Sequence, residues 1–183
     1  MAYKNTKTGY GSVARALHWL MALCIFGLFA LGYWMRTLTY YSPYYKTAPE
    51  LHQSIGLTLL ALLVFRFIWK LINPTPKHEG LTKLEDKGSS LLHWGFYVLL
   101  LAVMVVGYFI STLDGRVIHY FTLFDVPSVY TQKGLEELAG TVHWILAYLI
   151  IALAALHGFA AIWHHFVKQD RVLTSMVKGP SEN

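Results

Sequence analysis

The chain has 183 residues, of which 55% are hydrophobic, and its mean hydropathy is +0.43. This composition excludes an ordinary soluble domain and predicts a single membrane domain over residues 1–183. The net charge of +5 does not indicate a nucleic-acid partner, because the 15 Lys and Arg residues are distributed as in membrane proteins. The single cysteine, Cys24, excludes an internal disulfide and a multi-cysteine metal site.

Four segments are apolar and about 20 residues or longer, the length needed to cross ~30 Å of hydrocarbon. We predict membrane helices at approximately residues 13–36, 50–72, 89–112 and 135–167. Consecutive spans run in opposite directions, so the expected fold is all-α, an antiparallel four-helix bundle embedded in the lipid bilayer.

The first two predicted helices each carry a histidine, and the two histidines lie near opposite membrane surfaces. His18 lies near the start of the first helix and His52 near the start of the second. Arg66 follows His52 by fourteen residues, which puts it within about 40° of the same helix face. Arg66 is a candidate partner for a cofactor carboxylate, and snorkelling of its side chain to the interface is the alternative.

The third predicted helix carries His93 near the same membrane surface as His18. It could serve as a ligand in place of one of the other histidines. The connection at residues 114–133 mixes aromatic and polar residues, so we expect it to lie on the membrane surface. After Val167 we expect a short polar tail.

The fourth predicted helix carries two histidines in a stretch of thirty residues, 138–167, without Asp, Glu, Lys or Arg. His143 and His157 are fourteen residues apart, so they share one helix face and lie about 21 Å apart along it. Gly140, Ala147 and Ala154 on the same face leave room for a flat group. Close helix packing with hydrogen-bonded histidines is the alternative explanation, but two histidines in an apolar span favour a cofactor.

The distribution of positive charge predicts the orientation of the chain. Eleven of the 15 Lys and Arg residues fall on the side that holds both termini, and four fall on the other side: Arg36, Lys46, Arg116 and Lys133. Because cytoplasmic loops are enriched in Lys and Arg, both termini are expected in the cytoplasm.

Four of the histidines in the predicted spans fall into two pairs at two membrane depths. His18 and His157 are expected on the inner side, and His52 and His143 on the outer side. Two pairs, each drawn from different helices, match the two axial positions of a haem iron. A zinc site would need three or four convergent ligands and fits poorly; a proton relay remains open.

The chain resembles the bacterial cytochromes b561 of the four-helix, di-haem type. The matching motifs span nearly the whole chain: Arg-Ala-Leu-His-Trp-Leu at 15–20, Glu-Leu-His-Gln-Ser-Ile-Gly at 50–56, Arg66 followed by Asn-Pro-Thr-Pro at 73–76, the segment 93–97, His143, and the pattern from Leu156-His157 to His164-His165. The resemblance implies that His18, His52, His143 and His157 ligate the iron of two haems b. Whether His93 replaces one of these ligands or lines a quinone site stays open.

The resemblance also implies a function in the bacterial inner (cytoplasmic) membrane. A multi-pass protein of this type carries electrons between a periplasmic donor and a membrane quinone of the ubiquinone type. The donor could be a small molecule, such as superoxide, or a redox partner protein, so the chain is either a superoxide:quinone oxidoreductase or an electron carrier. The alternative is a cytochrome b anchor subunit of a dehydrogenase or hydrogenase.

Overall fold

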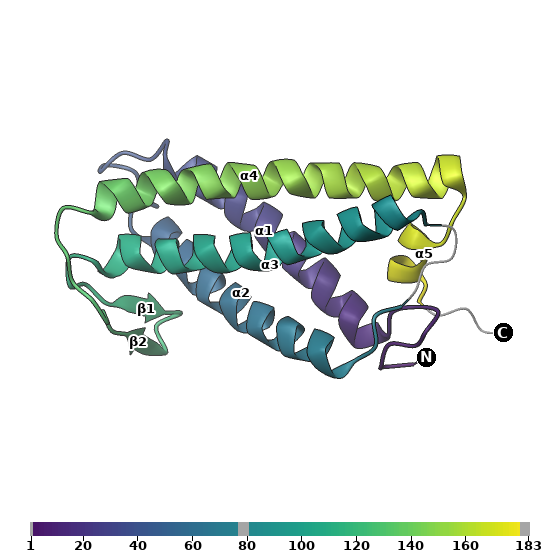
Figure 1. Cartoon of the computed structure of the whole chain (residues 1–183). Helices are drawn as coiled ribbons and strands as arrows, with labels where there is room; N and C mark the ends of the chain where they lie inside the picture. Colours follow the sequence, from purple (N-terminus) through teal and green to yellow (C-terminus); the bar gives the residue numbers. More distant parts are fainter. Residues whose placement is uncertain (1, 77–80, 180–183) are drawn as a thin grey trace. The chain divides into compact units, whose positions relative to one another are not determined.

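The structure, a computed structural model, describes residues 2–76 and 81–179 and is mostly helical (Figure 1). Four of its helices are long and apolar enough to cross a membrane, which confirms the predicted all-α membrane fold. The elements in chain order are α1 (Ser12–Met35), α2 (Thr47–Ile72), α3 (Lys83–Thr112), β1 (Ile118–Tyr120), β2 (Phe124–Val126), α4 (Glu136–Trp163), a π-helical turn η1 (His164–Lys168) and α5 (Val172–Val177).

The ends of α1, and of α4 taken with η1, agree with the predicted spans to within one residue, but α2 and α3 begin earlier. Helix α3 begins six residues before the expected start at Ser89. The reason is a capping box: the Thr82 backbone N–H donates to Glu85 Oε2 at 2.9 Å, and the Glu85 N–H donates to Thr82 Oγ1 at 3.3 Å. This polar turn extends the helix beyond the apolar run that marks the membrane span.

The C-terminal segment is not the polar tail expected from the sequence. After η1, Gln169 takes a left-handed conformation (φ +55°) and reverses the chain. Asp170 then accepts hydrogen bonds from His164 Nδ1 at 2.5 Å and from the N–H of Val172, the first residue of α5, at 3.0 Å. Ser175 in α5 is fully buried. Helix α5 spans fewer than two turns, which is too short for its hydrophobic periodicity to predict a helix from the sequence.

The chain forms two compact units, each assembled from parts of all four long helices. Unit 1 comprises Met1–Ala22, Leu62–Tyr97 and Ala152–Asn183; unit 2 comprises Leu23–Ala61 and Val98–Ile151. Few side chains are fully buried in either unit, because most apolar side chains of a membrane helix face lipid. The buried apolar residues are Leu17, Met21 and Leu63 in unit 1, and Ala48, Leu59, Leu100, Leu113, Ile118 and Ile150 in unit 2.

In unit 2 the connection after α3 contains a β-hairpin that packs against α2 (Figure 1). Strands β1 and β2 are antiparallel, with Ile118 opposite Val126 and Tyr120 opposite Phe124. The turn between them uses positive φ values at Phe121 and Thr122. Ser54 of α2, which is 1% exposed, accepts a hydrogen bond from the Phe121 N–H at 3.1 Å and thereby holds the turn against the helix.

Candidate functional site

Unit 2 brings His52 of α2 and His143 of α4 together. Their ring centres are 6.2 Å apart and their planes are inclined by 67°. Both residues line a cavity of about 780 Å³ among the four long helices. Gly140 and Ala147, two of the small residues expected beside the histidines, also line it, and so does Gly56. The sequence-predicted outer pair therefore shares one largely apolar cavity.

The two outer histidines differ in their hydrogen bonding. His143 Nδ1 lies 2.9 Å from the Val103 carbonyl oxygen of α3. Because a carbonyl can only accept, Nδ1 carries the proton and the Nε2 lone pair is free for a metal. His52 Nδ1 is buried and has no hydrogen-bond partner among the described residues. A buried, unsatisfied imidazole nitrogen is costly unless the site holds a further group.

Two glycines from neighbouring helices fit closely around these rings. A Cβ atom on Gly107 of α3 would lie 2.9 Å from His143 Cε1, and one on Gly32 of α1 would lie 3.2 Å from His52 Cε1. Contacts this short leave no room for a side chain at position 107. Gly32, Val103 and Gly107 are not identifiable as site residues from the sequence alone. The only sequence signal for Gly32 and Gly107 is that each is a glycine within an apolar span. Such a glycine indicates close helix packing but not which helix lies against it.

Unit 1 brings three histidines together. The ring centres of His18 and His157 are 6.1 Å apart, and those of His93 and His157 are 5.4 Å apart. Phe96 also packs edge-on against His157, at 5.8 Å. The two histidines of the predicted inner pair, His18 and His157, are therefore neighbours. His93 lies beside His157 in the same cluster.

Arg66 contacts the unit 1 cluster at His18. Its Nη2 is 3.2 Å from His18 Nδ1, and its Nη1 is 3.9 Å from the sulfur of Met21. Among the described residues Arg66 forms no ion pair with a carboxylate. Since a guanidinium can only donate, this contact makes His18 Nδ1 an acceptor.

The spacing of both pairs fits axial ligation of one iron by two imidazoles. Metal–imidazole bonds are about 2 Å long, so two ligands on opposite faces of a porphyrin have ring centres about 6 Å apart. The His52–His143 and His18–His157 pairs have this spacing, whereas the His93–His157 pair at 5.4 Å is closer. Among the described residues no group of three or more His, Cys, Asp or Glu side chains could hold a metal ion without such a cofactor.

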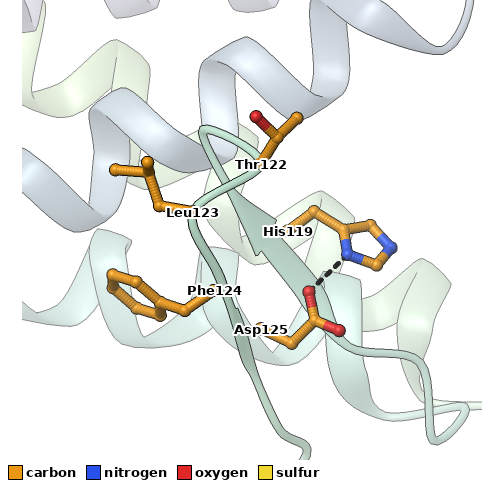
Figure 2. A pocket seen from close by; sticks show the side chains of 5 residues that line it. All are labelled: His119, Thr122, Leu123, Phe124 and Asp125. Atoms are coloured by element: carbon orange, nitrogen blue, oxygen red, sulfur yellow. Dashed lines mark hydrogen bonds and ion pairs between the residues drawn. The ribbon is translucent and has the colours of Figure 1, made fainter.

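A second hollow, of about 460 Å³, lies on the β-hairpin and is lined by His119, Thr122, Leu123, Phe124 and Asp125 (Figure 2). His119 Nδ1 is 2.6 Å from Asp125 Oδ1, and both side chains are more than half exposed. Unlike the cavity of unit 2, it contains neither a buried unpaired nitrogen nor a pair of facing histidines. We therefore assign the candidate functional sites to the paired histidines.

Four membrane-length helices whose histidines meet in facing pairs define a multi-pass membrane protein with the architecture of a b-type cytochrome. The chain belongs to the prokaryotic cytochrome b561 family, whose model matches residues 9–179. It is accordingly a membrane electron-transfer protein of a family that binds haem b.

Curated relatives match the chain along almost its whole length. Cytochrome b561 homolog 2 of Escherichia coli (strain K12) is 41% identical over 182 residues, covering 97% of this chain and 95% of the relative. The probable superoxide oxidase CybB of Yersinia pestis is 26% identical, covering 92% and 95%. Cytochrome b561 homolog 1 of Escherichia coli (strain K12) is 24% identical, covering 88% and 92%. The family predicted from the sequence motifs is therefore confirmed.

Proposed function

We propose that the protein binds two haems b per chain, one between His52 and His143 and one between His18 and His157. The observation that carries this proposal is the outer pair. Its ring centres are 6.2 Å apart within one cavity, and the Val103 carbonyl leaves Nε2 of His143 available for iron. The inner pair has nearly the same spacing, 6.1 Å.

The residues around each pair would orient the ligands and keep water away. Val103 holds the His143 ring by its Nδ1–H, while Gly32 and Gly107 allow the helices to approach the two outer rings closely. A bound haem b supplies one-electron redox chemistry whose potential depends on ligands, burial and nearby charge.

Arg66 would bind a propionate of the inner haem. Its present contacts, His18 Nδ1 and a thioether, are weak partners for a permanent cation in an apolar span. Iron on His18 Nε2 requires a proton on Nδ1, which then cannot accept from Arg66. The guanidinium would turn to a carboxylate instead, and a propionate provides one.

The two sites would carry electrons from a periplasmic donor to a ubiquinone-type quinone across the bacterial inner membrane, with both termini in the cytoplasm. With superoxide as donor, two superoxide ions give two O₂ and two electrons, and quinone takes up these electrons with two protons to form quinol. The similarity to a probable superoxide oxidase of Yersinia pestis supports this donor. The alternative is an anchor subunit that receives electrons only from a partner dehydrogenase or hydrogenase.

Haem stoichiometry and electron transfer of the purified chain test the proposal together. A pyridine haemochrome assay of the detergent-solubilised protein is expected to give two haems b per chain. In the absence of other proteins, superoxide is expected to reduce these haems, and added ubiquinone to reoxidise them. One haem per chain would refute the di-haem assignment. Two haems that superoxide does not reduce would favour the anchor-subunit alternative.

A further inference from the structure

The β-hairpin of unit 2 lies beside a membrane-spanning helix rather than above it. His119 O accepts a hydrogen bond from Ser54 Oγ at 3.3 Å, and Tyr120 OH lies 3.0 Å from Thr58 Oγ1. Ser54 and Thr58 follow the first residue of α2 by seven and eleven residues, which corresponds to about 10 and 16 Å along the helix axis. The hairpin therefore lies alongside the first half of α2 (Figure 1).

Two backbone N–H groups of the hairpin tip are hydrogen-bonded within the protein. The Phe121 N–H donates to Ser54 Oγ at 3.1 Å, and the Leu123 N–H donates to Tyr120 O at 2.8 Å. The two strands pair with each other through residue 124. Irregular backbone near lipid is tolerated where protein groups satisfy its N–H and C=O groups.

The side chains of the hairpin divide into an apolar and a polar group. Leu123 is 74% exposed and Phe124 is 57% exposed, and both point away from the His119–Asp125 pair (Figure 2). Phe124 stacks on Tyr120 with ring centres 4.8 Å apart, which fixes its direction. This segregation is typical of a segment that rests at a membrane interface.

We propose that the hairpin tip is a lipid anchor, with Leu123 and Phe124 inserted among the acyl chains of the outer leaflet. Ser54 and Thr58 hold the tip against α2, which is one of the membrane-spanning helices. The paired His119 and Asp125 stay in the headgroup region. This inference rests on the membrane-spanning helices alone and is independent of the number of haems and of the electron donor.

Spin-label accessibility in lipid vesicles tests the anchor. In a Cys24→Ala background, a nitroxide is attached to the Leu123→Cys variant of the full chain in phosphatidylcholine–phosphatidylglycerol vesicles. Collision of the label with O₂, which concentrates in lipid, is compared with collision with a water-soluble nickel chelate. Lys133→Cys in the same connection is the aqueous control, and Leu149→Cys, on a 43% exposed position of α4, is the lipid control.

The oxygen-to-nickel accessibility ratio at position 123 is expected to be several-fold higher than at position 133 and to approach that at position 149. A ratio equal to that at position 133 would place the tip in water and overturn the proposal. Low accessibility to both reagents would show that protein, either a partner or a second copy, covers the tip, and would overturn it as well. An unchanged haem absorption spectrum in each variant shows that the labelled chain is folded.

Discussion

His143 Nδ1 lies 2.9 Å from the carbonyl oxygen of Val103, so a residue of α3 fixes the orientation of a histidine of α4. The ring centre of His143 lies 6.2 Å from that of His52. Second-shell bonds of this kind hold metal-ligating histidines in the tautomer that the metal requires.

Replacing His143 with Ala is expected to remove the outer haem and leave the inner one, because the two proposed ligand pairs belong to separate units. The haemochrome assay should fall from two haems to one per chain. His119→Ala, at an exposed position of the hairpin, is the control and should keep both haems. Retention of both haems by His143→Ala would contradict the ligand assignment.

His18 and His93 are expected to respond differently to substitution, although both lie beside His157. His18→Ala should lose the inner haem, since the His18–His157 spacing of 6.1 Å fits axial ligation. His93→Ala should keep it with a low-spin spectrum, because His93 lies too close to His157 to bind the opposite face of one iron. Electron paramagnetic resonance of the oxidised variants measures this difference, and the reverse result would make His93 the ligand.

Adding a methyl group at Gly107 is expected to weaken the outer site. The new Cβ would lie 2.9 Å from His143 Cε1, an overpacking that typically costs about 1–3 kcal/mol. Gly107→Ala should therefore release haem from the outer site at a lower temperature or denaturant concentration than the wild type. Gly27→Ala is the matched control, because no neighbouring atom lies within 4 Å of a Cβ at that position. Equal haem retention in both variants would argue against a close fit at Gly107.

Removing the charge of Arg66 is expected to lower the midpoint potential of the inner haem, because a nearby cation stabilises the reduced iron. A loss of about 1.4 kcal/mol corresponds to about 59 mV for one electron. Redox titration of Arg66→Gln should show a shift on the order of this size in one of the two haems, and Arg66→Lys should show a smaller one. An unchanged pair of potentials would indicate that Arg66 only extends to the interface.

Substituting Asp170 is expected to destabilise unit 1. Its carboxylate bonds to His164 Nδ1 and to the Val172 N–H, and the His164 and Asp170 side chains are only 13% and 11% exposed. Asp170→Ala leaves these buried donors unsatisfied, at a cost of about 1–3 kcal/mol. In thermal unfolding in detergent, Asp170→Ala should have a lower midpoint temperature than Asp125→Ala. The Asp125 variant breaks only an exposed His–Asp pair, which contributes about 0–1 kcal/mol to stability. Equal unfolding midpoints of the two variants would show that the contacts of Asp170 do not stabilise unit 1.

The first turn of α3 and the helical C-terminal segment could not be predicted from sequence patterns. The apolar run predicted the membrane part of α3, but the polar first turn formed by Thr82 and Glu85 lay outside that signal. Likewise, η1 and α5 depend on long-range contacts: Arg15 Nη1 donates to the Val177 carbonyl at 2.7 Å, and Trp19 Nε1 donates to the Met176 carbonyl at 3.2 Å. Such contacts between residues far apart in the chain leave no local periodicity.

The sequence by itself determined the membrane class, the four spans and the cytochrome b561 family, because hydropathy and short motifs are properties of contiguous residues. It also predicted the depths of His18, His52, His143 and His157. Only the tertiary structure decided what surrounds them: Val103 at His143, Gly107 against its ring, His93 beside His157, and the hairpin along α2. The physical reason is that the rotation of each helix about its axis is set by packing against its neighbours, and a single helix does not encode it.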